Sequence, residues 1–349
     1  MEIKNQKKCL ITGGLGFFGS ALVKRLQASG ISCRVFDISE NQEDLGSVEC
    51  IKGDICDFES IKKACMNIDV VYHNVAQVPL AKNISAFNKV NIDGTKNALQ
   101  AALDCGVKKF VYTSSSAIFG VPKKNPVDEN VRPTPGEEYG EAKYAGEKIC
   151  NDFQKLGLDI SILRPRTIIG HGRLGIFQIL FEWISEGNNV PVLGNGQNIY
   201  QFIHSDDMAD ACILAGNSMG SSTYNCGAEE FGSMREVLED LCDYAKTGAR
   251  VVSVPMGLAV AGMNFTSKLG LSPLGPYHSL MYGRSMYFDI TKAKSELGWT
   301  PKYSNIRMFR EAYDWYLSNK ESLEIGVGDK SPHRSPLKQG VLRVVKWVI

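Results

Sequence analysis

The feature that most constrains the fold is a glycine-rich break between two apolar segments near the N-terminus. The apolar run at residues 9–12 predicts a buried strand, and the helical spacing that resumes after Gly19 predicts a helix. Between them, Gly14, Gly16 and Gly19 follow the spacing G-x-G-x-x-G. Such glycines permit a tight turn, the close approach of a pyrophosphate and the packing of helix on strand. The sequence therefore predicts a phosphate-binding loop with its anion at a helix N-terminus.

A second apolar run, residues 33–36, ends in Asp37. An acid about 20 residues beyond such a loop is expected to bind the 2′-hydroxyl of an adenosine ribose. The same carboxylate would repel a 2′-phosphate, so NAD is predicted as the cofactor in preference to NADP. The alternative is an ordinary surface aspartate that follows a strand.

The bulk composition excludes several classes of function. Among the 349 residues, 39 Lys and Arg balance 38 Asp and Glu, so the net charge of +1 gives no electrostatic reason to expect a nucleic-acid partner. The ten cysteines lack C-x-x-C pairs and nearby histidines, which indicates reduced core residues and no metal site. No apolar run reaches the length of a membrane span, and none precedes the first strand, so we expect a cytoplasmic protein.

Strands and helices alternate through the first half of the chain. Strands are expected at 48–55, 69–74, 109–113 and 159–164, and helices at 21–28, 58–66, 86–105 and 139–156. This alternation predicts an α/β fold with a doubly wound parallel sheet of the Rossmann type. We expect residues 1–165 to form the NAD-binding core, with segments at about 195–226 returning to it, and residues 166–319 to form mainly a smaller substrate-binding lobe.

Two apolar segments of the second half are open to more than one interpretation. Residues 251–265 predict either a substrate lid or the core of the second lobe. After an amphipathic helix at 306–317, residues 320–349 have the composition of a linker that ends in a basic and apolar tail. This tail, residues 341–349, suits a contact with a membrane surface, but also suits packing on a neighbour or disorder.

A tyrosine and a lysine stand four residues apart where a helix is expected. Tyr139 and Lys143 would therefore share one helix face, just after a serine cluster at residues 114–116 that ends a strand. An ammonium near a phenol stabilises the phenolate and lowers the pKa of the phenol. Such a tyrosine can exchange a proton with a substrate hydroxyl while hydride passes to or from nicotinamide.

Taken together, these motifs resemble the extended short-chain dehydrogenases/reductases, or NAD-dependent epimerase/dehydratase family, over residues 8 to about 317. Residues 12–19 are similar to the family's T-G-G-x-G-F-x-G, 53–55 to G-D-[IL], 73–76 to H-x-A-A, 91–95 to N-x-x-G-T and 289–299 to D-x-[ST]-K-A-x-x-x-L-G-W. The resemblance implies a cofactor site made of Gly13, Gly16, Phe17, Phe18, Gly19, Asp37, Asp54, Ile55, Ala76, Asn91, Tyr139, Lys143 and Pro165.

The same resemblance assigns catalytic roles. Residues 114–120 are similar to S-S-x-x-x-Y-G, with Phe119 in place of the tyrosine. Counting back from Phe119 gives Ser115 as the catalytic hydroxyl, while Ser114 and Ser116 stay open. Tyr139 would be the acid/base and Lys143 would bind the nicotinamide ribose.

The substrate side departs from the family pattern. Residues 194–207 are similar to the sugar-nucleotide enzymes' G-x-G-x-x-x-R-D-F-[IV]-H-V-D-D, but Tyr200 replaces the arginine that commonly holds a diphosphate. Thr167 likewise stands where many of those enzymes have Asn. The charge of the missing arginine could be supplied by Arg166, Arg173 or Arg284, although each could equally have an ordinary surface or salt-bridge role. The expected substrate residues are Gln77, Arg166, Thr167, Arg173, Tyr200 and Arg284.

Other segments resemble the hydroxysteroid/sterol dehydrogenase branch, namely Leu163-Arg164-Pro165 and residues 284–289. Sugar 4,6-dehydratases carry an Asp-Glu pair directly after the catalytic hydroxyl, where this chain has Ser116 and Ala117, so 4,6-elimination is not expected. The predicted function is NAD-dependent oxidation or epimerisation of a secondary alcohol, foremost of a nucleotide sugar. The alternatives are a sterol-like or other lipophilic alcohol, or a non-catalytic NAD-binding regulator. A homodimer is expected.

Overall fold

The computed structural model describes residues 7–39, 45–46, 48–77, 87–268, 281 and 283–324. Its strands are β1 (Lys8–Thr12), β2 (Ser32–Asp37), β3 (Glu49–Lys52), β4 (Val70–His73), β5 (Lys109–Thr113), β6 (Ile160–Pro165), β7 (Thr167–Ile169), β8 (Val190–Leu193), β9 (Ile199–Tyr200), β10 (Phe202–His204), β11 (Ser222–Cys226), β12 (Gly232–Ser233) and β13 (Val251–Val254). Its helices are α1 (Phe17–Ala28), α2 (Phe58–Cys65), α4 (Gly94–Asp104), α5 (Glu138–Lys155), α6 (Ile176–Ser185), α7 (Ser205–Asn217), α8 (Met234–Ala245), α9 (Met256–Lys268), α11 (Thr291–Leu297) and α12 (Asn305–Glu324), with short turns η1 (Lys89–Asp93) and η2 (Ser116–Phe119).

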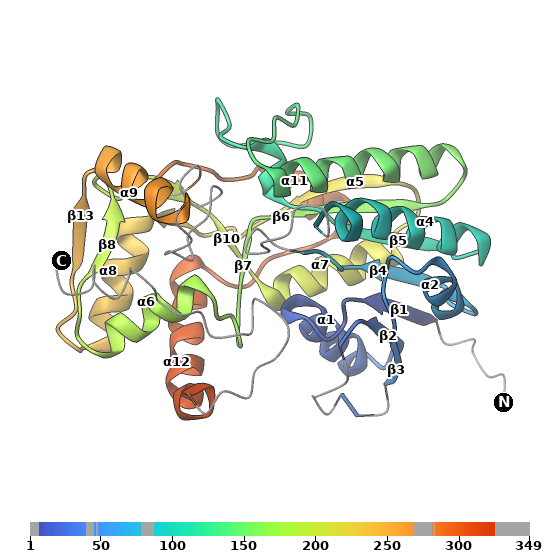
Figure 1. Ribbon diagram of the computed structural model, residues 1–349, viewed down its shortest axis with the longest axis horizontal. Coiled ribbons are helices and arrows are strands. Elements are labelled where there is room, and N and C mark those ends of the chain that lie inside the picture. The colour runs from blue at the N-terminus through green and yellow to red at the C-terminus, as the bar shows by residue number, and fades with distance from the viewer. Residues whose placement is uncertain are drawn as a thin grey trace.

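Seven of the strands form one parallel sheet in the order β11-β6-β5-β4-β1-β2-β3. The sheet lies in the right half of Figure 1, with helices above and below it. The chain starts in the middle of the sheet, at β1, and builds outward in both directions, as in doubly wound folds. The predicted Rossmann-type α/β fold is therefore confirmed.

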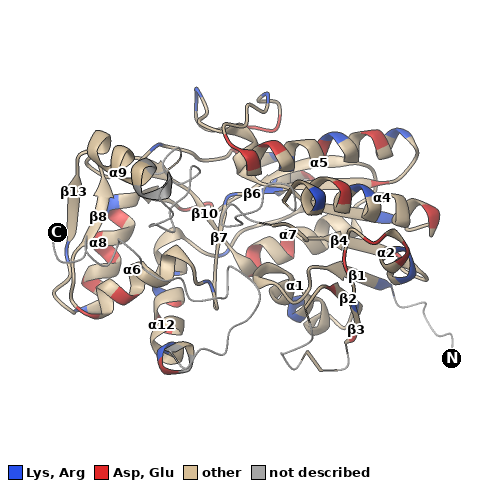
Figure 2. Ribbon diagram, in the orientation of Figure 1, with Lys and Arg blue, Asp and Glu red and all other residues tan. Residues whose placement is uncertain are grey.

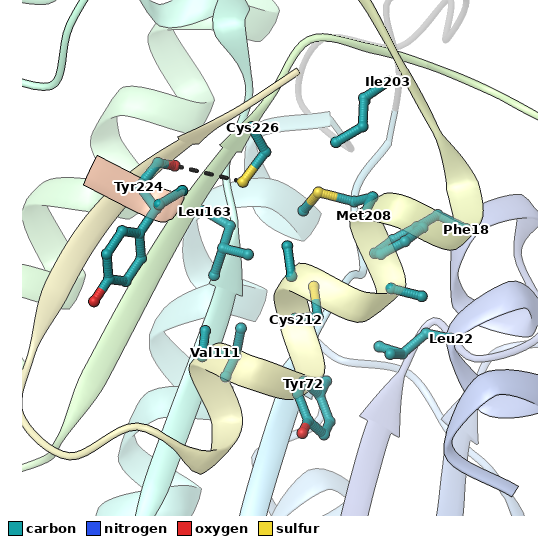
Figure 3. Packing of buried hydrophobic residues seen from close by; sticks show 14 of the residues in the cluster. Phe18, Leu22, Tyr72, Val111, Leu163, Ile203, Met208, Cys212, Tyr224 and Cys226 are labelled. Carbon is teal, nitrogen blue, oxygen red and sulfur yellow. Dashed lines mark hydrogen bonds between the residues drawn. The ribbon is translucent and has the colours of Figure 1, made fainter. Parts of the chain in front are cut away.

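Both faces of the sheet are buried against helices. On one face, α1 and α7 pack on strands β1, β4 and β5, and Figure 3 shows Leu22 of α1 and Cys212 of α7 in this core. On the other face, α2, α4 and α5 cover the sheet around Phe110 and Tyr112. A sheet covered on both sides needs strands that are apolar along their whole length, which explains why all five residues of β5 are buried.

The second half of the chain supplies a separate apolar cluster. Side chains from α6, β8, α8 and α12 pack together around Phe181, Phe202 and Phe309. These elements occupy the left half of Figure 1, beside the sheet, and β8 pairs with β13 in a parallel two-stranded sheet. The last helix, expected at residues 306–317, continues to Glu324, so the first five residues of the predicted linker are helical. The rest of the predicted tail lies outside the described residues.

Helix α9 differs from its neighbours in carrying an apolar surface that is not covered. Leu258 is 72% exposed and Phe265 is 66% exposed. Figure 2 shows the tan part of α9 without charged residues, and in the sequence none precedes Lys268, whereas α5 carries both blue and red and α8 is mainly red. The interpretation of residues 251–265 as buried lobe core is therefore wrong for α9, because none of its described side chains is buried.

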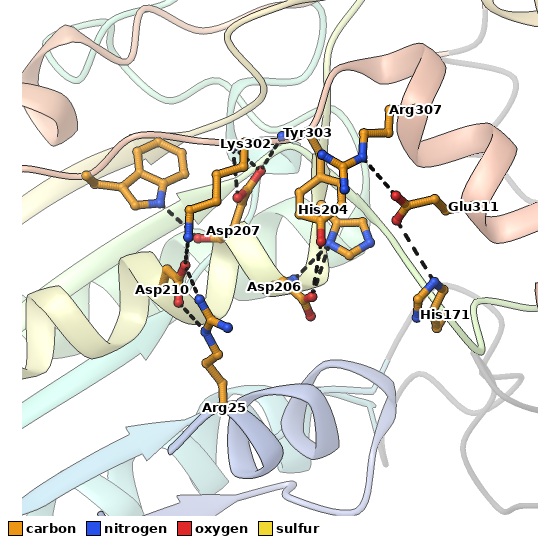
Figure 4. A network of polar contacts seen from close by, with 11 residues as sticks. Arg25, His171, His204, Asp206, Asp207, Asp210, Lys302, Tyr303, Arg307 and Glu311 are labelled. Carbon is orange, nitrogen blue, oxygen red and sulfur yellow. Dashed lines mark hydrogen bonds and ion pairs between the residues drawn. The ribbon is translucent and has the colours of Figure 1, made fainter. Parts of the chain in front are cut away.

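A polar network holds α7 against both α1 and the segment before α12 (Figure 4). Arg25 of α1 makes two hydrogen bonds to the carboxylate of Asp210, and Lys302 contacts the same carboxylate at 3.0 Å. The neighbouring Asp207 accepts hydrogen bonds from the backbone amides of Lys302 and Tyr303. Because α7 also packs on the sheet, this network fixes the position of the second half of the chain relative to the strand ends.

Within the described part of the chain, no helix is both long and apolar enough to cross a membrane. In the same residues, no group of three or more potential ligands is arranged to hold a metal ion. All ten cysteines are free thiols, seven of them buried.

Candidate active site

The strand ends bring the predicted site residues to one edge of the sheet. β1, β2, β4, β5 and β6 are parallel and all end at this edge, where ligands of doubly wound sheets bind. The same border of the sheet therefore carries the loop after β1, Asp37 at the end of β2, the serines after β5 and Pro165 at the end of β6. Residues far apart in the sequence are assembled here by strand order alone.

The glycine-rich loop has the geometry that a dinucleotide requires. Gly13 has φ +69°, a conformation that L side chains rarely adopt, and a Cβ on Gly19 would overlap the carbonyl oxygen of Gly13. Gly16 precedes α1 without a side-chain cap, and the first turn of α1 contains no acidic residue. The first amides of α1 can therefore bind a pyrophosphate. Phe17 and Phe18, at the start of α1, are buried and hold this end of the helix in the core.

Asp37 connects the loop to the second strand. Its carboxylate accepts hydrogen bonds from the amides of Leu15 and Ser39, both at 3.0 Å. Gly53 donates from its amide to the carbonyl oxygen of Asp37 at 2.8 Å, so the G-D-[IL] segment follows directly alongside. Asp54 accepts from the amide of Cys56, and Ile55 is buried against Gly94. These residues can hold the adenosine half of the cofactor.

Asn91 fixes the chain that leaves β4. Its side-chain oxygen accepts from the amide of Gln77 at 2.8 Å and its nitrogen donates to the carbonyl oxygen of Gln77 at 3.0 Å. This two-way clamp sets the path of residues 74–77, including the half-buried Ala76. Gln77 is therefore held by its backbone, while its side-chain oxygen is buried without a hydrogen-bond partner.

The three serines after β5 have three different partners. The Ser114 hydroxyl donates to Glu147 at 2.6 Å, and Ser116 accepts from Arg166 at 2.8 Å. The Ser115 hydroxyl lies near the phenol of Tyr139 and acts to lower the pKa of Tyr139. Of the three hydroxyls, Ser115 is thus the one beside the phenol, in agreement with the motif count.

Tyr139 and Lys143 lie one turn apart near the start of α5. Burial raises the pKa of Tyr139 to about 12, against the lowering effects of Ser115 and of the Arg173 charge. Burial also lowers the pKa of Lys143 to about 8. Lys143 donates to the carbonyl oxygen of Thr113 at 2.8 Å and its ammonium lies 4.9 Å from the Tyr112 ring centroid. The expected stabilisation of the phenolate by Lys143 is not seen here, because the ammonium is bonded to the strand end.

A buried ion pair that the sequence analysis missed supports this arrangement. Glu147, one turn beyond Lys143 on α5, accepts two hydrogen bonds from Arg164 of β6, at 2.9 and 2.7 Å, and a third from Ser114. Both side chains of the pair are less than one-tenth exposed. The signal in the sequence was an acid four residues after Lys143, on the face of a helix otherwise buried against the sheet.

Besides Gln77, which lies against Asn91, the expected substrate residues fall into three places. Arg166, Thr167 and Tyr200 lie together, since Tyr200 contacts Thr167 at 3.1 Å between hydroxyls and the Arg166 guanidinium lies 4.5 Å from the Tyr200 ring centroid. Arg173 lies elsewhere, over the rings of Phe17 and Phe177, and its charge reaches Tyr139. Arg284 is exposed on the surface beside Asn198. Phe288, which the sequence analysis did not single out, lies 5.8 Å from the Arg166 guanidinium.

A family model for the NAD dependent epimerase/dehydratase family matches residues 9–227, which include the loop, the serines, Tyr139, Lys143 and Arg166. The chain belongs to this family. The predicted resemblance, the enzyme class and NAD as the cofactor are thereby confirmed.

Several individual proteins are similar over long stretches. The chain is 52% identical to the uncharacterized protein y4nG of Sinorhizobium fredii, over 98% of this chain and 86% of the relative. It is 28% identical to UDP-glucose 4-epimerase of Mycolicibacterium smegmatis, over 84% of this chain and 94% of that protein. It is 30% identical to the decarboxylating sterol-4-alpha-carboxylate 3-dehydrogenase of Bos taurus, over 64% of each chain.

A solved structure is similar to the chain over most of its length. UDP-glucose 4-epimerase of Thermotoga maritima, crystallised with UDP-glucose, has a TM-score of 0.75 and 25% identity, over 90% of this chain and 99% of that one. The chain is therefore similar to both a nucleotide-sugar branch and a sterol branch, as its mixed motifs indicate.

Proposed function

We propose that the protein oxidises a secondary alcohol with NAD, with Tyr139 as acid/base, Ser115 as the hydroxyl that holds the reacting oxygen and Lys143 as the group that binds the nicotinamide ribose. The observation that carries this proposal is the proximity of the Ser115 hydroxyl to the Tyr139 phenol, in a chain whose glycine loop is shaped for a dinucleotide. It argues against a non-catalytic NAD-binding regulator, which would have no need of a phenol and hydroxyl aimed at one another.

The geometry assigns each group a task. NAD, when bound, supplies the acceptor for a hydride. Ser115 donates to the oxygen of the substrate carbinol and orients it. Tyr139, in its phenolate form, takes the hydroxyl proton and becomes the neutral phenol as the carbonyl forms. Lys143, anchored on Thr113, places a cation at the end of β5. Net epimerisation follows if the ketone turns in the site and is reduced again on its other face.

A nucleotide sugar is the leading substrate class. Support comes from the similarity to two UDP-glucose 4-epimerases, one of them over 94% of its length and the other over 99%. Against a conventional diphosphate site stands Tyr200, which cannot form the bidentate contact of an arginine. Arg173, beside the phosphate loop and Tyr139, is placed to meet a negatively charged part of such a substrate.

A lipophilic alcohol is the second candidate, and one specific observation favours it. Helix α9 exposes Leu258 and Phe265, and it carries no charge over residues 256–266. An exposed apolar helix in the second lobe suits contact with an apolar ligand or surface. The similarity to a sterol-4-alpha-carboxylate 3-dehydrogenase supports the same class.

A ligand panel separates the two classes. Thermal unfolding is measured with NAD present, against UDP-sugars in one arm and 3-hydroxysteroids in the other, since a ligand of the folded state raises the unfolding temperature. NADH absorbance and sugar or steroid analysis then identify the product. Stabilisation and turnover in neither arm would overturn the proposed function for both classes.

Three further expectations accompany the proposal. We expect a homodimer and a cytoplasmic location. We also expect residues 1–165, with segments at about 195–226, to form the cofactor lobe and residues 166–319 to form mainly the substrate lobe. Analytical ultracentrifugation of the full chain tests the dimer. Co-sedimentation with liposomes, for the full chain against a chain that ends at Lys320, tests whether the C-terminal tail contacts a membrane surface.

A further inference from the structure

Arg166 is a buried cation without an anion. Its side chain belongs to a residue that is 1% exposed, and no carboxylate of the described residues pairs with it. Nη1 donates to the Ser116 hydroxyl at 2.8 Å, whereas Nε and Nη2 have no hydrogen-bond partner. Since an arginine keeps its charge in proteins, an unpaired guanidinium at this depth is costly.

The two nitrogens of Arg166 that lack a partner, Nε and Nη2, are the ones that bind carboxylates elsewhere in this structure. Arg164, two residues earlier, uses Nε and Nη2 to hold Glu147, and Arg25 and Arg310 use the same two atoms to hold Asp210 and Asp240. This edge of a guanidinium presents two parallel N–H donors that match the two oxygens of one carboxylate. In Arg166 the equivalent edge lacks its acid.

The faces of the same guanidinium are covered by rings. Its centre lies 4.5 Å from the Tyr200 centroid and 5.8 Å from that of Phe288. Cation–π contacts hold the group in place but replace only part of the lost hydration. Tyr200, which stands where related enzymes have an arginine, therefore packs its ring against the Arg166 guanidinium.

The guanidinium is anchored on a residue next to the reacting centre. Ser116, which anchors Nη1, follows Ser115 in the chain, and Ser115 contacts the Tyr139 phenol. A group bound at Arg166 would thus lie beside the carbon that Tyr139 and Ser115 serve. In a sugar oxidised at C4, the diphosphate on C1 lies on the opposite side of the ring from C4. A substituent on C3 or C5 lies next to C4.

We propose that the Nε–Nη2 edge of Arg166 binds a carboxylate that the substrate carries on a carbon next to the one oxidised, or one bond further. The inference rests on the proposed function and names its substrate class: a hydroxy acid, either a nucleotide-linked uronic acid or a hydroxysteroid acid. Arg166 is then a specificity-determining residue, and its charge is neutralised when the substrate binds.

The test compares substrates that differ only in the carboxylate. One pair is UDP-glucuronic acid and UDP-glucose, and the other is a 3-hydroxysteroid with and without a 4-carboxylate, each with NAD. In the class that reacts, kcat/KM for the acid exceeds that for the neutral partner by about 10- to 100-fold, as expected for a charge-assisted contact. This comparison needs only the wild-type chain.

Variants locate the effect. Arg166→Gln lowers kcat/KM for the acid by about 10- to 100-fold and changes that for the neutral partner by less than about threefold, while Arg166→Lys restores part of the preference. Arg250→Gln, an exposed arginine of the second lobe, serves as the control. NAD affinity and thermal unfolding show whether each variant is folded.

The outcomes are distinct. If the neutral partner reacts as well as the acid, the carboxylate inference is wrong and the proposed oxidation stands. Arg166→Gln could instead lower kcat/KM for UDP-glucose, and the strength of inhibition by UDP, as much as it lowers kcat/KM for UDP-glucuronic acid. In that case the edge binds phosphate and the inference is again wrong. If no member of either pair reacts or stabilises the NAD-bound chain, the proposed function and the inference both fail.

Discussion

Lys143 donates a hydrogen bond from Nζ to the carbonyl oxygen of Thr113, 2.8 Å away, and so ties α5 to the end of β5. The bond places a buried cation at the strand edge where the cofactor binds. The pKa of Tyr139 is set by burial, by Ser115 and by the charges of Glu137 and Arg173. We therefore expect Lys143 to act on the cofactor side of the site and the phenol to depend on its hydroxyl neighbour.

Tyr139→Phe is expected to abolish turnover without loss of NAD. The phenol oxygen is needed to accept the substrate proton, and removal of a general acid/base lowers kcat by about 10²- to 10⁴-fold. NAD affinity, measured by quenching of protein fluorescence, should stay within about threefold, because the loop and Asp37 are untouched. Tyr144→Phe, on the same helix, is the matched control. Full activity of the Tyr139 variant would remove this residue from the mechanism.

Asp37→Ala is expected to weaken NAD and to spare NADP. The carboxylate is placed to accept from the ribose hydroxyls, and a hydrogen bond to a charged group contributes about 1.5–3 kcal/mol, or about 10- to 100-fold in affinity. The variant also frees the amide of Leu15, so the loop itself loosens slightly. Isothermal titration with NAD and NADP measures the ratio, with Asp152→Ala as a surface control. An unchanged ratio of the two affinities would contradict the ribose assignment.

The buried pair of Glu147 and Arg164 gives a stability prediction. Glu147→Gln leaves the Arg164 charge buried without its partner, which costs about 3–5 kcal/mol in the free energy of unfolding. The double variant Glu147→Leu, Arg164→Met removes both charges and should be less destabilised than the single one. Urea unfolding checks this, and Asp152→Asn, which breaks an exposed pair with Lys155, should change little. Equal losses for the single and double variants would show that packing dominates.

Local patterns predicted the sheet and the identity of the cofactor well, and they also named the candidate residues of the cofactor site. The glycine spacing, the position of Asp37 and the four-residue step from Tyr139 to Lys143 are short-range features, so the sequence alone exposes them. The length of η2 could not be read, but the motif count still placed Ser115 beside Tyr139. Here sequence and structure agree because each feature lies on one strand end or one helix turn.

The substrate side could not be predicted, for a physical reason. Arg166, Ser116, Tyr200 and Phe288 come from four separate segments and meet only through tertiary packing. The interpretation of the apolar stretch of α9 as lobe core was wrong for the same reason, because composition does not reveal whether an apolar helix face is covered by another element. The partner of Lys143 was likewise invisible, because a backbone carbonyl at a strand end has no signature in the sequence.

Asp207 gives a pH prediction with an unusual sign. Burial raises its pKa to about 6, whereas an aspartate in the unfolded chain has a pKa of about 3.9. Between these values the folded chain binds more protons than the unfolded chain, so this residue makes the free energy of unfolding fall as pH rises from about 4 to about 6. The total change is about 3 kcal/mol, from two pKa units at about 1.4 kcal/mol each.

Asp210, on the same helix, supplies a control of opposite sign. Although burial acts to raise its pKa, hydrogen bonds from Arg25 and Lys302 lower it below the ordinary value, so its contribution is lost as pH falls. Urea unfolding at pH 4 to 7 should therefore show that Asp207→Asn flattens a decline in stability toward pH 6, whereas Asp210→Asn removes stability most at the higher pH. Parallel curves for wild type and Asp207→Asn would mean that Asp207 ionises normally, and that its three backbone hydrogen bonds from Lys302 and Tyr303 compensate fully for burial.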